Sequence, residues 1–296
     1  MNKSFKPAQI LIFALFLGSF ATSILRGQNE QTSSDWANQV RFKLFGGVAA
    51  NQHQINAPEL TGYPIFTPRD SFNAGPANFQ TTVALGWWGG IGVDVPLANT
   101  LALSLAASAQ PHNVLLTTSE QTRVGTLTGT SIDARIGYVY DIRLLAAGLD
   151  ALLAWRPIES AGLSICAGAR GAWLVERRIT QREELLEPNF GGFTPSGERV
   201  RNLRQEMLES AQQLQVHALG ALRYDAAIPL QGAWLLISPE IQVGYPITRI
   251  TRQDAWQLAF ARAGIAIGFA ARPEPKVEPV VYPPLPPGYT APSSKQ

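Results

Sequence analysis

The middle of the chain alternates apolar and polar positions with the two-residue period of a β-strand. In residues 79–95 the odd positions are mostly Phe, Val, Leu, Trp and Ile, whereas the even positions are mostly Gln, Thr, Ala, Gly and Asp. Residues 213–228 and 235–247 repeat the pattern. Successive side chains of a strand point to opposite faces, so each segment predicts a strand with one apolar face.

A change of phase interrupts this alternation near Leu145. Apolar residues occupy even positions in 132–144 and odd positions from Ala147 to Trp155. Because a slip of one residue moves every side chain to the other face, we predict a β-bulge at this point.

Short turns alternate with long connections along the chain. The turns at 95–103, 156–165 and 228–237 each place a Pro after a strand, then a few small or polar residues and an apolar restart. Longer polar connections occupy about 51–78, 116–130, 182–210 and 249–254. Three turns and four connections predict eight strands, at about 39–50, 79–95, 100–115, 131–157, 162–181, 211–229, 233–248 and 255–271.

The composition indicates which face of these strands meets water. Only 16% of the residues are charged, against about 25% in an average soluble domain. The polar face carries Gly, Ala, Ser, Gln and Arg, and Lys43 is the only Lys between residues 27 and 273. An outer-membrane barrel has lipid outside, polar residues inside, and short turns opposite long loops. We therefore predict an all-β fold, a transmembrane up-and-down antiparallel β-barrel with short periplasmic turns and long extracellular loops.

Both ends of the chain differ from the predicted barrel at 39–272. Residues 1–27 combine Lys3 and Lys6 with an apolar segment from Ile10 to Phe20, which predicts a secretory signal peptide. An uncleaved anchor helix is the alternative. Cleavage after Gly27 changes 24 basic and 22 acidic residues to 21 and 22, so the net charge goes from +2 to −1 and nothing suggests nucleic acid. Residues 28–38 form a polar N-terminal extension, and 273–296, with 8 Pro, predict a disordered periplasmic tail.

Aromatic residues near the strand ends predict two girdles at the membrane interfaces. A tilted strand crosses a 25 Å apolar band in about ten residues. Measured from the short turns, three aromatics lie near the turn end and three lie 9 to 13 residues away. Ordinary core aromatics are the alternative. The predicted girdle residues are Trp87, Trp155, Trp173, Trp234, Tyr245 and Phe269.

Residues 40–272 resemble the OmpA/OmpX-type family of eight-stranded outer-membrane barrels. The last strand, AGIAIGFA at 263–270, is similar to the terminal signal that barrel-insertion machinery reads, with Gly264 and outward Phe269 as its key residues. The Pro-rich tail resembles the linker to a peptidoglycan-binding domain, but only 24 residues follow the barrel, so cell-wall anchoring is not implied. The resemblance implies location in the outer membrane of a Gram-negative cell.

Charged residues on the inward phase predict an ion-pair set that fills the lumen. Six bases and five acids nearly balance, and an eight-stranded barrel is just wide enough for side chains to fill. Buried charges are tolerable when paired, so a packed polar plug is the first interpretation and a gated ion path is the second. The set comprises Arg41, Lys43, Asp94, Asp150, Arg156, Arg170, Glu176, Arg223, Asp225, Glu240 and Arg262.

Candidate catalytic and metal-binding residues are sparse. His217 faces the lumen by phase, and Asp225 is too far along the strand to orient it. His53 and His112 lie near the outer strand ends without an evident partner, where a lone His is ordinarily solvated. Cys166, the only Cys, has the phase of a small packed residue. We therefore expect no enzyme, no catalytic residue, no metal site and no cofactor.

The long connections are the remaining candidate binding region. An extracellular ligand could bind loops 51–78 and 182–210, and residues 200–215 could form a short helix above the barrel. We predict a monomeric outer-membrane protein with a structural or surface-interaction role and a plugged lumen. A porin-like channel for ions or small solutes is the alternative, and a barrel-type hydrolase or acyltransferase is the third possibility. The expected partners of the protein are outer-membrane lipid and the barrel-insertion machinery.

Overall fold

The computed structural model describes residues 35–55, 82–125, 128–158, 161–193, 196–251 and 256–271. The predicted signal peptide, the tail at 273–296 and most of loop 51–78 lie outside the described residues. No helix within the described ranges has the length and apolar character to cross a membrane. The elements are η1 (Asp35–Asn38), β1 (Arg41–Ile55), β2 (Thr82–Ala98), β3 (Leu101–Pro111), β4 (Val114–Gly125), β5 (Ser131–Trp155), β6 (Leu163–Glu187), β7 (Val200–Met207), β8 (Leu214–Tyr224), β9 (Ala226–Leu230), β10 (Ala233–Pro246) and β11 (Trp256–Ala271).

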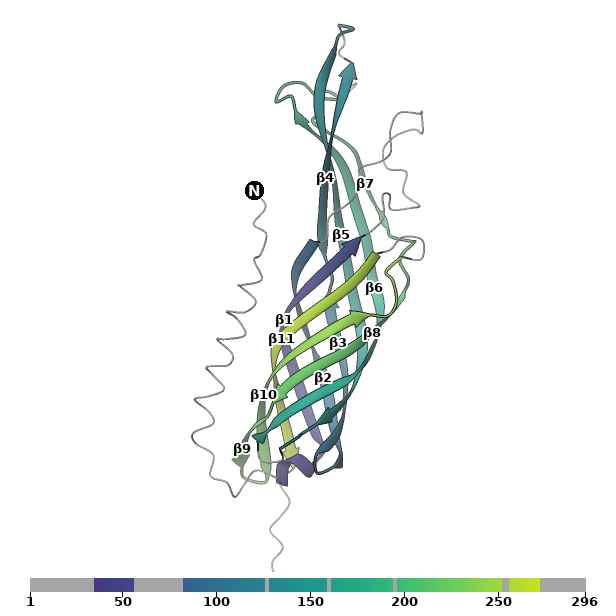
Figure 1. The fold of residues 1–296 in the computed structure, drawn as a ribbon. Coiled ribbons are helices and arrows are strands. Elements are labelled where there is room, and N and C mark those ends of the chain that lie inside the picture. Colours follow the sequence, from purple (N-terminus) through teal and green to yellow (C-terminus); the bar gives the residue numbers. More distant parts are fainter. Residues whose placement is uncertain are drawn as a thin grey trace, which may run out of the picture.

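The strands close into a barrel of antiparallel neighbours (Figure 1). The ring runs through β1, β2, β3, β5, β6, β8, β10 and β11, and β11 pairs back with β1 over its whole length. Strand β9 continues β8 after a break at Asp225 and pairs with β10. The predicted antiparallel barrel is confirmed, with a ring of eight strands among the described residues.

Four strands rise well beyond the rest of the barrel at the end opposite the short turns (Figure 1). Strand β4 pairs with the first half of β5, and β7 pairs with the last part of β6. We call the part formed by β4, β7, residues 131–144 of β5 and residues 176–187 of β6 the extension. The predicted loops at 116–130 and 182–210 are wrong where β4, the end of β6 and β7 occupy 116–125, 182–187 and 200–207. The predicted helix within 200–215 is also wrong, since strand pairing with the long β6 overrides the helix propensity of β7.

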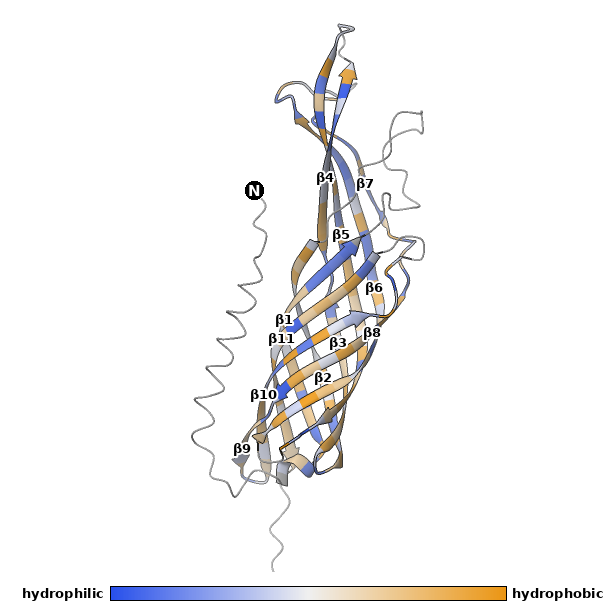
Figure 2. Ribbon diagram, viewed as in Figure 1, coloured by the Kyte–Doolittle hydropathy of each residue, from blue (hydrophilic) through white to orange (hydrophobic). Residues whose placement is uncertain are grey.

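The barrel wall is apolar outside and polar inside. Phe42, Leu85, Leu149 and Ile241 are exposed on the outer surface, whereas Arg and Asp side chains are buried within the ring. Apolar and polar residues alternate along the barrel strands (Figure 2). A water-soluble barrel has the opposite arrangement, so this wall is built to face lipid.

The phase change in the sequence marks the point where the interior changes from polar to apolar. Strand β5 itself keeps the same face inward. Even positions of β5 are buried from Ala134 to Ala154, apart from the half-buried Gly148, so this strand never turns over. The predicted bulge does occur, between Leu145 and Ala146, but the additional residue is Val175 of β6. Beyond the bulge, β6 buries the odd positions Ile179, Gln181, Glu183 and Leu185 instead of even ones.

Above this bulge the molecule has an ordinary apolar core. Leu116, Ile136, Tyr140, Ile142 and Ile179 are almost completely buried between the strands of the extension. Their outward neighbours include the exposed Arg123, Asp133 and Arg143. The extension therefore has the arrangement of a water-exposed β-structure, directly above a wall arranged for lipid.

Candidate functional site in the barrel interior

The inner side chains form layers from one end of the barrel to the other. Along β11, the inward residues run from Ala270 at the turn end through Ala266, Arg262 and Phe260 to Trp256 at the extension end. Because inward positions come from every second residue of each strand, each layer gathers residues that are distant in sequence. The layers alternate between apolar clusters and two networks of charged and amide side chains.

The lower network lies near the turn end and is centred on two carboxylates. Asp94 accepts contacts from Arg41 at 3.0 Å, Lys43 at 3.0 Å and Arg223 at 3.0 Å. Asp225 pairs with Arg41 at 2.8 Å and Arg223 at 3.3 Å. Two serines complete it, since Lys43 donates to Ser104 Oγ and Ser238 donates to Asp225. Carboxylates and guanidinium groups buried this deeply are tolerable only because they are paired in this way.

The upper network is centred on Asp150. This carboxylate binds Arg170 at 2.8 Å and Arg262 at 3.3 Å, and Arg170 also donates to Ser108. Arg262 donates to Gln110 Oε1 at 2.6 Å and Gln242 Oε1 at 2.8 Å, and its guanidinium lies 4.2 Å from the Phe260 ring centroid. Amide oxygens thus accept hydrogen bonds from the Arg262 guanidinium in addition to the Asp150 carboxylate.

The histidines are buried in the upper barrel, not solvated on loops. Asn51 Nδ2 donates to the Pro111 carbonyl, so Asn51 Oδ1 is an acceptor, and His112 Nδ1, 2.9 Å away, carries a proton. Trp256 Nε1 donates to His53 Nδ1 at 3.3 Å, and His217 Nε2 lies 3.2 Å from the Leu258 carbonyl. The expectation that His53 and His112 are solvated and unpartnered is wrong, whereas the inward orientation of His217 is confirmed.

A short N-terminal segment closes the turn end of the barrel. Trp36 of η1 is 2% exposed and packs with Trp234, Leu236 and Ala270. The Arg156 guanidinium lies 5.1 Å from the Trp36 ring centroid and donates to the Ala37 carbonyl at 3.3 Å. Sequence reasoning missed this contact, because residues 28–38 have no period. The only available signal was a Trp just before the first strand.

Two predicted site residues lie elsewhere. Glu176 does not face the lumen: it pairs with the outward Leu145, because the additional residue Val175 inverts the phase of β6 just before it. Trp234 is not on the outer surface but 2% exposed inside the ring, on the inward even phase of β10 that Leu236 shares. The other five predicted girdle residues are exposed on the outer surface, by 50–69%.

The rest of the predicted lumen set faces the interior. Glu240 lines a small cavity with Lys43, Trp88 and Gln242. Its volume is about 10 Å³, roughly the space of a single water molecule. Without Glu176, the interior holds six bases and four acids of the predicted set. Cys166 is buried, as its phase predicted.

Gly264 has a packing role in the described structure. It pairs with Gly47 where β11 meets β1, and a Cβ on Gly264 would lie 2.4 Å from the Gly46 carbonyl oxygen. The strands approach closely at this seam only because both residues lack a side chain. Phe269 is 53% exposed on the same strand.

The extension contains one buried carboxylate. Glu183 is fully buried on the inner face and binds Arg201 of β7. Burial raises the pKa of Glu183, and the Arg201 guanidinium opposes that shift. Burial likewise raises the pKa of Tyr138 to about 12. Within the described residues, no group of His, Cys, Asp and Glu is arranged to hold a metal ion.

Comparisons with known proteins add little to this geometry. No protein-family model and no curated protein matches the chain. Among solved structures, OprG from Pseudomonas aeruginosa has 11% identity and a TM-score of 0.28, with 79% of this chain and 98% of that chain covered. The outer-membrane protease OmpT from Escherichia coli has 9% identity and a TM-score of 0.25, with 82% of this chain and 100% of that chain covered. The translocator domain of the autotransporter NalP from Neisseria meningitidis has 10% identity and a TM-score of 0.24, with 86% of this chain and 97% of that chain covered. At these scores the barrel is established by its strand pairing alone.

Proposed function

We propose that this chain is an outer-membrane β-barrel with a structural or surface-interaction role and a closed lumen. The observation that carries the proposal is the reversed arrangement of the wall, with exposed Leu and Ile outside and buried Arg–Asp networks inside. Only closed barrels and helices satisfy every backbone polar group within lipid. The predicted signal peptide and the terminal strand support export and insertion by the barrel-insertion machinery.

Gel mobility with and without boiling tests membrane-barrel folding directly. Without boiling, the folded barrel is expected to resist unfolding by detergent and to run at a different position from the boiled chain. Sedimentation with the membrane fraction is the accompanying measurement. Identical mobility together with recovery in the soluble fraction would contradict the proposal.

The lumen is proposed to be closed to ions and solutes. Trp36 and its neighbours fill the turn end, two ion-pair networks fill the middle, and the apolar cluster around Leu174, Leu258 and Trp256 fills the extension end. Purified protein in a planar bilayer is expected to give no steady openings. Steady single-channel openings would instead support the alternative of a porin-like channel.

The extension is proposed to be the interacting part of the molecule. It would hold β4, β7 and the upper parts of β5 and β6 outside the membrane on a rigid scaffold, where ligand-binding segments are commonly found. We propose no catalytic activity, because His53 and His112, the residues best placed for a hydrolase, are buried and hydrogen-bonded to Trp256 and Asn51. Deletion of the extension should abolish any surface binding. The difference in mobility between the unboiled and boiled barrel should remain.

A further inference from the structure

Two arginines lie directly opposite each other on the outer surface, just above the apolar wall. Arg143 of β5 and Arg178 of β6 are cross-strand partners, and both are exposed. Side chains in that relation have Cβ atoms roughly 5 Å apart, and like charges there destabilise the sheet. An anion between the two guanidinium groups would remove this repulsion.

These arginines lie at the height where the wall changes from apolar to polar. Below them on β5 the outward residues from Leu145 to Trp155 are apolar, which is about ten residue steps, or about 25 Å for a tilted strand. On β6 the exposed Trp173 and Val175 end the apolar face, and the outward Glu176 lies between them and Arg178. This height corresponds to the boundary between acyl chains and headgroups on the side of the extension.

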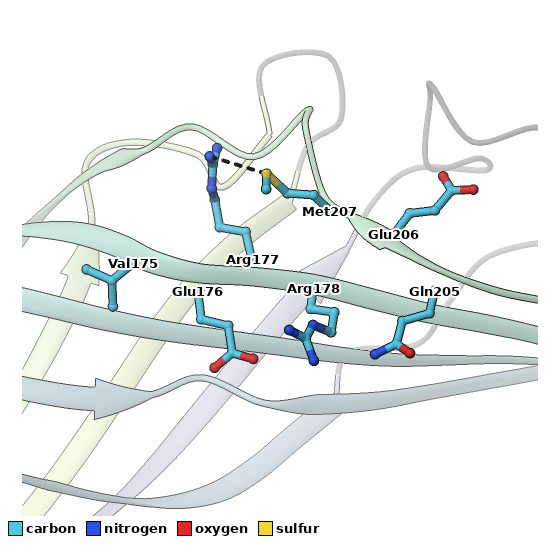
Figure 3. A pocket seen from close by; sticks show the side chains of 7 residues that line it. All are labelled: Val175, Glu176, Arg177, Arg178, Gln205, Glu206 and Met207. Atoms are coloured by element: carbon cyan, nitrogen blue, oxygen red, sulfur yellow. Dashed lines mark hydrogen bonds between the residues drawn. The ribbon is translucent and has the colours of Figure 1, made fainter.

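An open groove adjoins Arg178 of the pair. Its volume is about 600 Å³, and it is lined by residues 175–178 of β6 and 205–207 of β7. Figure 3 shows Arg178 pointing to the same side of the strands as Glu176 and Gln205, with Arg177 on the opposite side. Arg177 donates to the Ala211 carbonyl at 3.0 Å and contacts Met207 Sδ at 3.9 Å, so its guanidinium is already held.

Acidic groups near the pair do not neutralise it fully. Asp141 contacts Arg143 at 3.5 Å, but both side chains are substantially exposed, and such pairs contribute little. Glu176 shares the face of Arg178, and Glu206 points away from it (Figure 3). No salt bridge of 4 Å or less joins Arg178 to a carboxylate in the part of the chain that the structure describes. Arg178 is therefore available for an external anion.

We propose that Arg143 and Arg178 bind the phosphate of a lipid headgroup in the leaflet adjacent to the extension. Guanidinium groups bind phosphate oxygens through paired, charge-assisted hydrogen bonds. The apolar residues below the pair, Leu145, Trp173 and Val175, would contact the acyl chains of the same lipid. This inference rests on the proposed membrane location and adds to it a preference for one headgroup chemistry.

Native mass spectrometry of lipid retained on the purified barrel tests the proposal. Phosphatidic acid and phosphatidylcholine are titrated separately onto wild-type protein and onto the double variant Arg143→Gln/Arg178→Gln. The matched control is Arg123→Gln/Arg135→Gln, which removes the same charge from β4 and β5 of the extension, farther from the wall. The Arg143→Gln/Arg178→Gln variant is expected to bind phosphatidic acid at least about tenfold more weakly than the wild type and the control variant.

Three results would overturn this inference: an equal loss in both double variants, no loss in either, or displacement of the lipid by millimolar inorganic phosphate. Unboiled gel mobility and bilayer insertion are measured on every variant. If those remain normal while the headgroup preference is absent, the phosphate site fails and the membrane barrel stands. If they fail in the wild type, the proposed membrane location is wrong.

Discussion

At the scale of single residues, the interior depends on carboxylates that each hold several cations. Asp94 is 3% exposed and contacts Arg41, Lys43 and Arg223. The inward phase of these residues could be predicted from strand alternation alone. Which carboxylate meets which cation could not, because the pairs join β1, β2 and β8, whose relative heights depend on barrel stagger.

The Asp94→Asn variant tests the importance of this centre. It leaves three cations around a neutral amide, and breaking a buried pair in this way costs about 3–5 kcal/mol. The expected result is a clearly lower temperature for loss of the folded band on unboiled gels. The exposed Asp133→Asn serves as the matched control, with a cost of about 0–1 kcal/mol. Equal stability of the two variants would show that the lower network is not what holds the barrel interior.

Glu183 should make the extension sensitive to pH. Its pKa is raised in the folded state, so between the ordinary carboxyl pKa of about 4.3 and the raised value the native state binds more protons than the unfolded state. Stability in that window therefore falls as pH rises, and Glu183→Gln should remove the dependence. Hydrogen exchange of β6 and β7 amides, corrected for intrinsic rates, measures this. The same pH slope in the variant would assign the effect to another group.

At the scale of elements, one additional residue determines how the wall joins the extension. The sequence indicated a phase change near Leu145, and the structure places the bulge there but on the partner strand, at Val175. Periodicity alone could not distinguish a strand that turns over from an interior that changes from polar to apolar. For the same reason β4 and β7, whose outer residues face water, were expected to be loops.

Deletion of Val175 tests this role of the bulge. Without the additional residue, Leu174 and Glu176 would be consecutive and would pair with Ala146 and Leu145 without a bulge, so Ile179, Gln181 and Leu185 would keep facing inward. The expected result is an extension that stays resistant to protease, on a barrel that still shows altered mobility when unboiled. Val175→Ala, which keeps the residue count, should also behave like wild type. A protease-sensitive extension in the deletion variant would contradict the assignment of Val175 as the additional residue.

At the scale of the whole molecule, two environments follow one another along the same strands. The lower part has apolar residues outside and charges inside, and the extension has the reverse. The composition reflects both, with 46% hydrophobic residues and a mean hydropathy near zero. Closure of the barrel was predictable because every strand had one apolar face, whereas the N-terminal plug was not, because a single turn around Trp36 carries no periodic signal.

Spin-label accessibility along β6, in protein reconstituted into bilayers, tests the central claim most directly. Single cysteines are introduced at outward positions 165, 169, 173 and 175, and at 176, 178 and 180, in a Cys166→Ala background. We predict that labels up to 175 are accessible to oxygen and shielded from a water-soluble nickel complex, and that labels at 178 and 180 show the reverse. Nickel accessibility throughout the lower positions, or labels at 178 and 180 that are accessible to oxygen and shielded from nickel, would contradict a lipid-facing wall that ends at the bulge.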